Sequence, residues 1–168
     1  MNKKVLYTAF AYSIFVIIFK LLILLGGYQL TRFGFYYSHV ITVFLVVPFM
    51  IIAVKLVRDK DQGGKIGGRD ALKIALGVAG ISVIILSIYN YVEFEWKLKE
   101  LSKLYYSSDD YLNFLKKNPK IKPENYSKII EENSISLSSF RAVTAKLFSF
   151  LIISSGSAFL TAVFMKKK

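Results

Sequence analysis

The stretch VLYTAFAYSIFVIIFKLLILLGGY, at residues 5–28, decides the fold class of this chain. Its one charged side chain is Lys20, and its apolar residues form a continuous block instead of the short periodic runs of a soluble core. About 20 apolar residues cross a hydrocarbon core of roughly 30 Å as a helix, at about 1.5 Å per residue. The block is too long for the core of a signal peptide, and no small-residue cleavage site follows it. Residues 5–28 are therefore predicted to span a membrane.

Three further blocks have the same character, at residues 37–57, 71–92 and 143–165. Helices are required, because four segments cannot close a barrel and every backbone polar group in lipid needs an internal partner. We predict an all-α, polytopic membrane protein in which residues 1–168 form a single four-helix membrane domain.

The composition separates this chain from basic soluble proteins. Its 168 residues carry a formal net charge of +12 and are 54% hydrophobic, and the mean hydropathy is +0.46. Such a charge on a soluble domain would indicate nucleic acid as a partner, but such a domain does not have a positive mean hydropathy. We therefore interpret the cations as a topology signal and expect no nucleic-acid partner. The lack of cysteine in the sequence excludes disulfides and thiolate metal sites.

Lysine and arginine gather in the two tails and in the loop between the second and third blocks. Lys3 and Lys4 precede the first block, and residues 166–168 are all lysine. Six cations occupy or border the middle loop: Lys55, Arg58, Lys60, Lys65, Arg69 and Lys73. The short segment 29–38 holds only Arg32. Because cytoplasmic loops carry the excess of cations, we predict a multi-pass protein of the bacterial inner membrane with both termini and the middle loop in the cytoplasm.

The long segment 93–142 is predicted to be an extracytoplasmic helical loop. Apolar residues at spacings of three and four follow the third block, which predicts that its helix continues beyond the membrane. Residues 107–110 offer N-cap side chains for a second helix through about Lys117. Pro123 suits the first turn of a third helix that runs to about Glu132. We expect these helices to form a small cap on the bundle.

Three short motifs lie around the middle loop: Arg58-Asp59, Gly63-Gly64-x-Ile66 and Ala71-Leu72-Lys73. Together they resemble the signature of domain-of-unknown-function family 4199, which comprises four-span inner-membrane proteins common in Bacteroidota. The resemblance extends over the whole chain and implies topology, not an activity. This chain has Gly68-Arg69-Asp70 where the family tends to have an aromatic residue followed by glycine. Members often lie near polyprenyl-phosphate glycosyltransferases in genomes, so the resemblance also implies such an enzyme as a partner.

The middle loop is a candidate binding site for lipid headgroups or for a partner protein. Its candidate residues combine charge with glycine backbone: Arg58, Asp59, Gly63, Gly64, Lys65, Arg69 and Lys73. Basic residues near an anionic membrane surface contribute roughly 1 kcal/mol each to its binding. A nucleotide-binding P-loop is not predicted, because Ile66 stands where the motif needs serine or threonine after its lysine. The alternative is a positive-inside loop whose glycines only allow a tight return.

Lys20 is the one costly feature that we identify within a span. A cation at the bilayer centre costs about 2.5–3.5 kcal/mol on insertion scales and is by default a functional-site hypothesis with a partner. We predict an intramembrane charge pair between Lys20 and Glu93, at the outer end of the third span, with Asn90 and Gln29 at a similar depth. The alternative is that the lysine stem lies in lipid and the ammonium reaches the outer headgroups. A proton path is disfavoured, because no second acidic residue is identified within a span.

Small residues in the third and fourth spans predict close helix packing. The residues chosen for this role follow small-xxx-small spacing or adjoin it: Ala75, Ala79, Gly80, Ser154 and Ala158.

Residues with catalytic or metal-binding chemistry do not form a recognisable set in this sequence. His39 is the one histidine and is interpreted as part of the outer aromatic belt. Ser155 and Ser157 are polar residues of the fourth span, but no histidine–aspartate pair or second lysine is identified at their depth to activate a nucleophile. We predict no catalytic residue, no metal site and no cofactor.

These observations favour a function in binding over one in catalysis. The leading hypothesis is a non-catalytic accessory or stabilising subunit of a larger membrane protein complex, with membrane lipids and other integral membrane proteins as partners. One alternative is a small oligomeric carrier of a lipid, an ion or a small molecule, with Lys20 in its path. Another is an accessory partner of a polyprenyl-phosphate glycosyltransferase. A homo-oligomer is compatible with each of them.

Overall fold

The structure is a computed structural model that describes residues 2–31, 33–135 and 138–166. Its α-helices are α1 (Lys3–Leu25), α2 (Ser38–Phe44), α3 (Val46–Asp61), α4 (Gly68–Glu93), α5 (Lys99–Tyr106), α6 (Asp109–Lys116), α7 (Tyr126–Ile135) and α8 (Ser139–Met165). Short 3-10 turns η1 (Tyr28–Leu30) and η4 (Pro123–Asn125), and π-helical turns η2 (Phe33–Tyr37) and η3 (Phe94–Leu98), complete the order.

Four helical stretches are long and apolar enough to cross a membrane: Lys3–Leu25, Ser38–Asp61, Gly68–Tyr106 and Val143–Met165. The predicted all-α fold with four transmembrane helices and a small helical cap is confirmed. The protein is therefore a multi-pass membrane protein.

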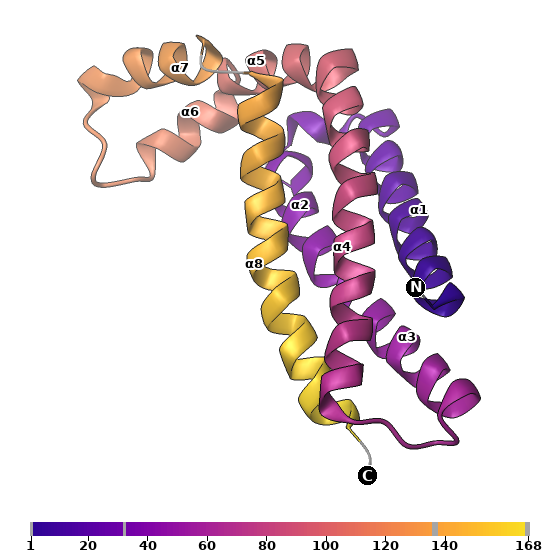
Figure 1. The fold of residues 1–168 in the computed structure, drawn as a ribbon. Helices are drawn as coiled ribbons and strands as arrows, with labels where there is room; N and C mark the ends of the chain where they lie inside the picture. The colour runs from indigo at the N-terminus through magenta and orange to yellow at the C-terminus, as the bar shows by residue number, and fades with distance from the viewer. Residues whose placement is uncertain (1, 32, 136–137, 167–168) are drawn as a thin grey trace.

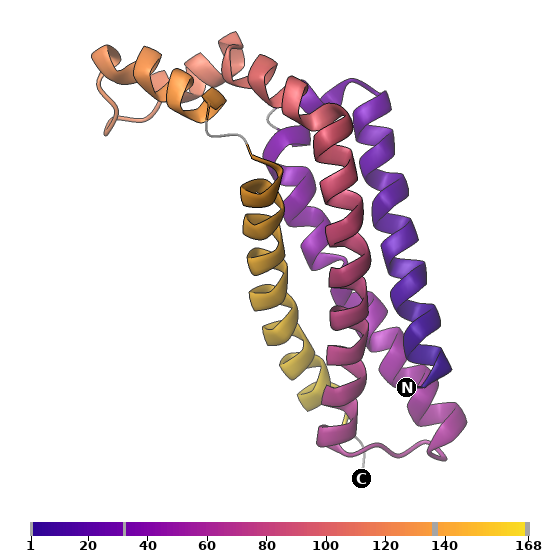
Figure 2. The ribbon, with the colours of Figure 1, turned by 45° about the horizontal axis from the view of Figure 1, so that its top comes forward.

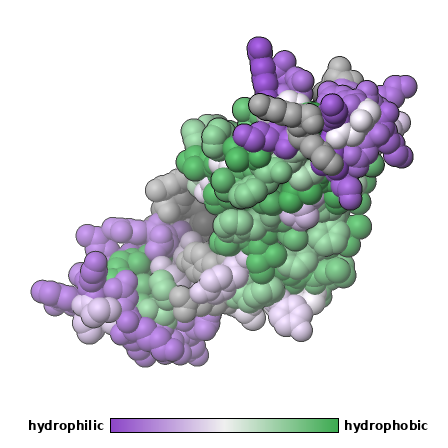
Figure 3. Space-filling model, turned by 90° about the horizontal axis from the view of Figure 1, so that it is seen from below, coloured by the Kyte–Doolittle hydropathy of each residue, from purple (hydrophilic) through white to green (hydrophobic). Residues whose placement is uncertain are grey.

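Helix α4 lies at the centre of the bundle and packs against α1, α3 and α8 (Figures 1 and 2). The core between these helices contains fully buried side chains from each of them, among them Tyr12, Met50, Val78 and Ala158. Large apolar side chains also cover much of the outside of the spans, and Figure 3 shows this hydrophobic belt between two hydrophilic regions. Such a surface suits lipid contact, because lipid tails are as apolar as the side chains that meet them.

The two ends of the bundle differ in what they carry. At one end, which we call the loop end, lie the start of α1, the α3–α4 connection and the end of α8 (Figure 1). Lys4 and Asn2 at the start of α1 donate hydrogen bonds to Asp61 at the end of α3. Lys166 lies beside Gly68 at the start of α4. The opposite end, which we call the cap end, carries η1, η2 and helices α5–α7.

The second span is interrupted, contrary to the prediction from the sequence. Residues 37–57 were expected to form one helix, but α2 ends at Phe44 and α3 begins at Val46. Pro48 explains the break: it has no N–H to donate to the carbonyl of Phe44, and its ring crowds that carbonyl.

The cap is built from three short helices that pack on one another. Ser108 caps α6 by accepting a hydrogen bond from the N–H of Tyr111. The buried side chains Tyr105, Tyr111 and Leu115 form a small core of their own. Asn133 on α7 donates to the Tyr111 hydroxyl at 2.9 Å, which ties the last cap helix to α6. Helix α5 also contacts η1, so the cap rests on the first interhelical turn.

Candidate functional site

A charge pair is buried between α1 and α4 near the cap end. Lys20 is 8% exposed and Glu93 is 4% exposed. The Lys20 ammonium donates to Glu93 Oε2 at 2.7 Å and to Asn90 Oδ1 at 2.7 Å. The Tyr89 hydroxyl donates to the other carboxylate oxygen, Oε1, at 2.9 Å, and the Tyr89 ring centroid lies 5.4 Å from the ammonium. The ammonium of Lys20 thus ends on Glu93 instead of reaching outward along the lipid.

Helical spacing on α4 explains why one lysine finds three partners. Tyr89 and Glu93 are four residues apart and therefore lie on the same side of α4, and Asn90 adjoins them. The carboxylate is held by two donors, so its charge is compensated although it is buried. Removing one member of such a pair leaves an uncompensated buried charge, which typically costs about 3–5 kcal/mol.

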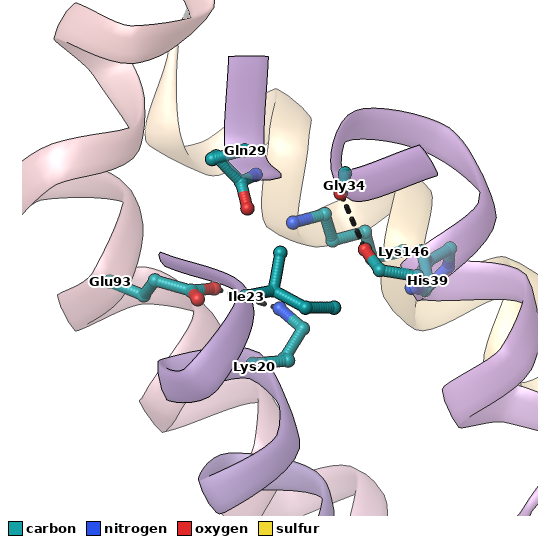
Figure 4. Close-up of a pocket in the computed structure, with 8 residues that line it drawn as sticks. Lys20, Ile23, Gln29, Gly34, His39, Glu93 and Lys146 are labelled. Carbon is teal, nitrogen blue, oxygen red and sulfur yellow. Dashed lines mark hydrogen bonds and ion pairs between the residues drawn. The ribbon is translucent and has the colours of Figure 1, made fainter. Parts of the chain in front are cut away.

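A second lysine, Lys146 on α8, lines the same small cavity as the pair. The cavity is also lined by Ile23, Gln29, Gly34, Ser38 and His39, and it has room for about one water molecule. Figure 4 shows the side chains of Lys20, Glu93, Gln29 and Lys146 converging on this space from four different elements. In the described part of the chain, no hydrogen bond or ion pair joins Lys146 to another residue.

Lys146 is not among the site residues predicted from the sequence. It lies three residues inside the span Val143–Met165, about 5 Å from the start of that span at 1.5 Å per residue. Lys20 lies five residues before the end of α1, about 8 Å from that end. The similar depths were available by counting. The sequence does not show that the side chains of Lys20 and Lys146 point toward each other, because this depends on how α1 and α8 are rotated in the bundle.

His39 also differs from its expected place in an aromatic belt. Its side chain is partly buried and lines both this cavity and a neighbouring one that includes Tyr12, Asn90 and Phe150. Its Nε2 atom is buried, and no hydrogen-bond partner for it is found among the described residues. Buried polar atoms usually have a partner, so this Nε2 atom stands out among the polar atoms of the site.

Two π-helical turns border the cluster. Turn η3 begins at Phe94, directly after Glu93, and turn η2 contains Gly34, whose backbone lines the cavity. A side chain at Gly34 would overlap the carbonyl group of Tyr28, so only glycine allows η2 to approach η1 this closely. Single π-helical turns occur frequently at functional sites. The cluster is therefore assembled by irregular backbone on two sides.

Comparison with known proteins places this architecture in a family. The family described as "Protein of unknown function (DUF4199)" matches residues 6–167. The chain belongs to this family. No curated protein and no solved structure matches the chain significantly.

The residues that carried the family resemblance lie at the loop end of this DUF4199 protein. Arg58 donates to both carboxylate oxygens of its neighbour Asp59, at 2.7 and 3.3 Å. Gly63 and Gly64 have φ values of +59° and +84°, which favour glycine, and they turn the chain back toward α4. Ile66 is buried in the main core and fixes the loop to the bundle. The glycines thus have a structural task.

The remaining candidates of the loop are exposed cations. Lys65, Arg69 and Lys73 are exposed side chains at the loop end of the DUF4199 bundle. None of them lines either of the two cavities described above. These exposed cations can contact a charged membrane surface, whereas the side chains of the cap-end cluster surround a defined cavity.

The small residues proposed for helix packing divide into two groups. Ala75, Ala79, Ser154 and Ala158 are buried in the bundle of this DUF4199 protein. Gly80 differs, because a methyl group placed there would have nothing within 4 Å. Gly77 makes the close approach instead, since a methyl group there would lie 3.0 Å from Val5 on α1. One residue of helix rotates a side chain by about 100°, which is why Ala79 is buried and Gly80 is open.

Metal-binding groups do not gather in the described ranges of the protein. Among residues 2–31, 33–135 and 138–166, no three or more His, Cys, Asp or Glu side chains are placed to hold a metal ion. The chemistry that the cap-end cluster offers is the binding of charge, by two ammonium groups and one carboxylate.

Proposed function

We propose that this DUF4199 protein is a non-catalytic subunit of a larger membrane protein complex. The observation that carries the proposal is an open notch on α8. Gly156 is exposed, and a methyl group there would have nothing within 4 Å. It adjoins the exposed Ser155 and lies between Ile152 and Phe159, which are 71% and 61% exposed. In lipid, small residues on an outward face allow another helix to approach closely, and such contacts drive association.

Helix α4 offers a second opening at Gly80. Its flanking residues Leu76 and Ile84 are both exposed, so this side of α4 faces outward. Gly80 lies about 18 Å from the start of α4, and Gly156 lies about 14 Å from the end of α8 at Met165. Both positions are therefore at a similar distance from the loop end on two neighbouring helices.

We further propose that the protein lies in a bacterial inner membrane with both termini in the cytoplasm. Support comes from the cations of the tails and of the middle loop, since cytoplasmic segments carry the excess of lysine and arginine. These segments share the loop end, which makes a single orientation compatible with all of them. A reporter fused to the C-terminus should be active only if it is a cytoplasmic reporter. Activity of a periplasmic reporter there would contradict this topology.

Affinity purification from native membranes in a mild detergent tests the subunit role. The wild-type protein should retain a second integral membrane protein, identified by mass spectrometry. The variant Gly156→Leu should fold at least as well, because leucine is a better helix former than glycine, but it should lose that partner. Leu22→Phe on α1, at another exposed position, is the matched control and should retain it.

Recovery of this chain alone would contradict the subunit proposal. If the chain were then a homo-oligomer that Gly156→Leu dissociates, the notch would serve self-association, and the oligomeric carrier would become the better account. If Gly156→Leu retained the same partner as the wild type, α8 would not be the contact.

A further inference from the structure

We propose that the cap-end cavity binds one phosphate-type anion through the ammonium groups of Lys20 and Lys146. This inference concerns a ligand site inside the bundle, and it does not depend on the subunit role proposed above. The site comprises Lys20 on α1, Gln29 on η1, His39 on α2, Glu93 at the end of α4 and Lys146 on α8 (Figure 4).

The charges of the cavity do not balance. Two ammonium groups face one carboxylate, and Glu93 is already bonded to Lys20 and to Tyr89. Lys146 lines the cavity without an ion pair among the described residues. A lysine within a span is costly unless it is paired or reaches the interface. An anion in the cavity would supply the missing negative charge to Lys146 and lie close to Lys20.

The neutral groups around the cavity suit an anion with several oxygen atoms. His39 keeps a buried Nε2 without a partner among the described residues, and a neutral histidine can donate from this atom. Gln29 directs its amide toward the same space with the oxygen atom foremost, and a flip of this amide presents its two N–H donors instead. Together with the lysines these groups offer donors from α1, η1, α2 and α8, which is the pattern required to hold the oxygen atoms of a phosphate.

The size and depth of the cavity select the kind of phosphate. The enclosed space is only water-sized, so it takes the terminal oxygen atoms of a phosphate and leaves the remainder of the molecule outside. The cluster lies about 5–8 Å inside the ends of its helices, which is within reach of the headgroup region. A phosphate monoester, either on a lipid or free in solution, has the charge and the terminal oxygen atoms that this site requires.

The opposing possibility is that Lys146 simply loses its proton and needs no anion. The two possibilities differ in what removal of the lysine does. If an anion binds, Lys146→Met abolishes the response to phosphate and leaves the Lys20–Glu93 pair balanced. If Lys146 is neutral, the same change leaves any response to phosphate unaltered.

Thermal unfolding of the full chain in detergent micelles provides the test, with Tm followed by circular dichroism. Four probes are compared: phosphatidic acid, zwitterionic phosphatidylcholine, inorganic phosphate, and sodium chloride at matched ionic strength. Saturating phosphatidic acid or inorganic phosphate should raise the Tm of the wild type by about 5 °C over its neutral control, because a ligand that binds only the folded state stabilises it. Lys146→Met should lose this rise. Lys97→Met, an exposed lysine at the same end, is the matched control and should retain it.

The comparison of these probes distinguishes a lipid phosphate from a free phosphate. A rise with phosphatidic acid alone assigns a lipid headgroup, and a rise with inorganic phosphate assigns a free phosphate. A rise that Lys146→Met keeps in full, or no rise with either probe, overturns the proposal. If Lys146→Met does not fold, Lys146→Gln replaces it, and native mass spectrometry of the wild type shows whether an anionic lipid stays bound. The proposal is also overturned if the wild type retains no anionic lipid and Lys146→Gln keeps the full rise in Tm.

Discussion

The basic residues at the two ends of the bundle lie in opposite environments. At the loop end, Lys65, Arg69 and Lys73 are exposed, and each can move to meet water or a membrane surface. At the cap end, Lys20 is buried against Glu93, and Lys146 points into a small cavity. The two tails and the middle loop hold 11 of the 23 Lys and Arg residues, and we interpret these as a topology signal. The two cations of the second kind, Lys20 and Lys146, line one defined cavity.

This difference has an energetic side. Exposed ion pairs contribute about 0–1 kcal/mol, because water screens them and holding two long side chains costs entropy. A buried charge that loses its partner costs several times more, because nothing replaces the lost interaction. Counting charges along a sequence therefore gives no measure of their importance, whereas their burial does.

The largest expected effect comes from breaking the buried pair. Glu93→Gln leaves Lys20 buried without a carboxylate and should lower the free energy of unfolding by about 3–5 kcal/mol. Denaturant-induced unfolding in detergent measures this loss. Glu124→Gln, which changes a glutamate in an exposed cap pair with Lys122, is the control and should have no measurable effect. If Glu93→Gln were as stable as this control, the pair would contribute nothing to folding.

A smaller effect is expected from the backbone that frames the cluster. Gly34→Ala places a methyl group against the backbone of Tyr28 and should cost about 1–3 kcal/mol, as overpacking does elsewhere. Gly156→Ala on the open face of α8 should instead stabilise the helix, by up to about 1 kcal/mol. The same unfolding assay compares the two. Equal effects at both positions would mean that η2 can move away from η1 without loss.

The smallest effect is expected at the loop end. Lys65→Gln and Arg69→Gln should each change the free energy of unfolding by less than about 0.5 kcal/mol, because both side chains are exposed. Their effect should appear instead in topology, as a shift in the fraction of molecules with a cytoplasmic C-terminus when several cations are replaced together. A loss of stability comparable to that of Glu93→Gln would remove the distinction between the two ends.

Much of the architecture was accessible from the sequence because hydrophobic length and charge have a direct physical meaning in a bilayer. The spans follow from apolar blocks, and counting residues places Lys20 and Glu93 at comparable depths. The break after Phe44 follows from Pro48, a local rule that the length of the apolar block obscured.

The composition of the cap-end site was only partly accessible. Lys146 stands near the edge of a span and resembles an interfacial lysine until the rotation of α8 is known. The need for glycine at position 34 arises from the contact between η1 and η2, which no local pattern encodes. The placement of His39 likewise depends on the fold around η2. The sequence alone could not predict features that depend on how several helices are rotated relative to one another.

The π-helical turn η3 has a mechanical consequence. Helical backbone continues from α4 through η3 into α5, while Figures 1 and 2 show α5 turning away across the end of the bundle. The two helices are joined at a bend, with a length of about 39 Å in α4 and about 12 Å in α5. Spin labels on α5 and at the loop end of α4 would report whether the two helices rotate together. The bend at η3 lies directly after Glu93. A movement of the cap helices would therefore rotate the end of α4 and displace the carboxylate that binds Lys20.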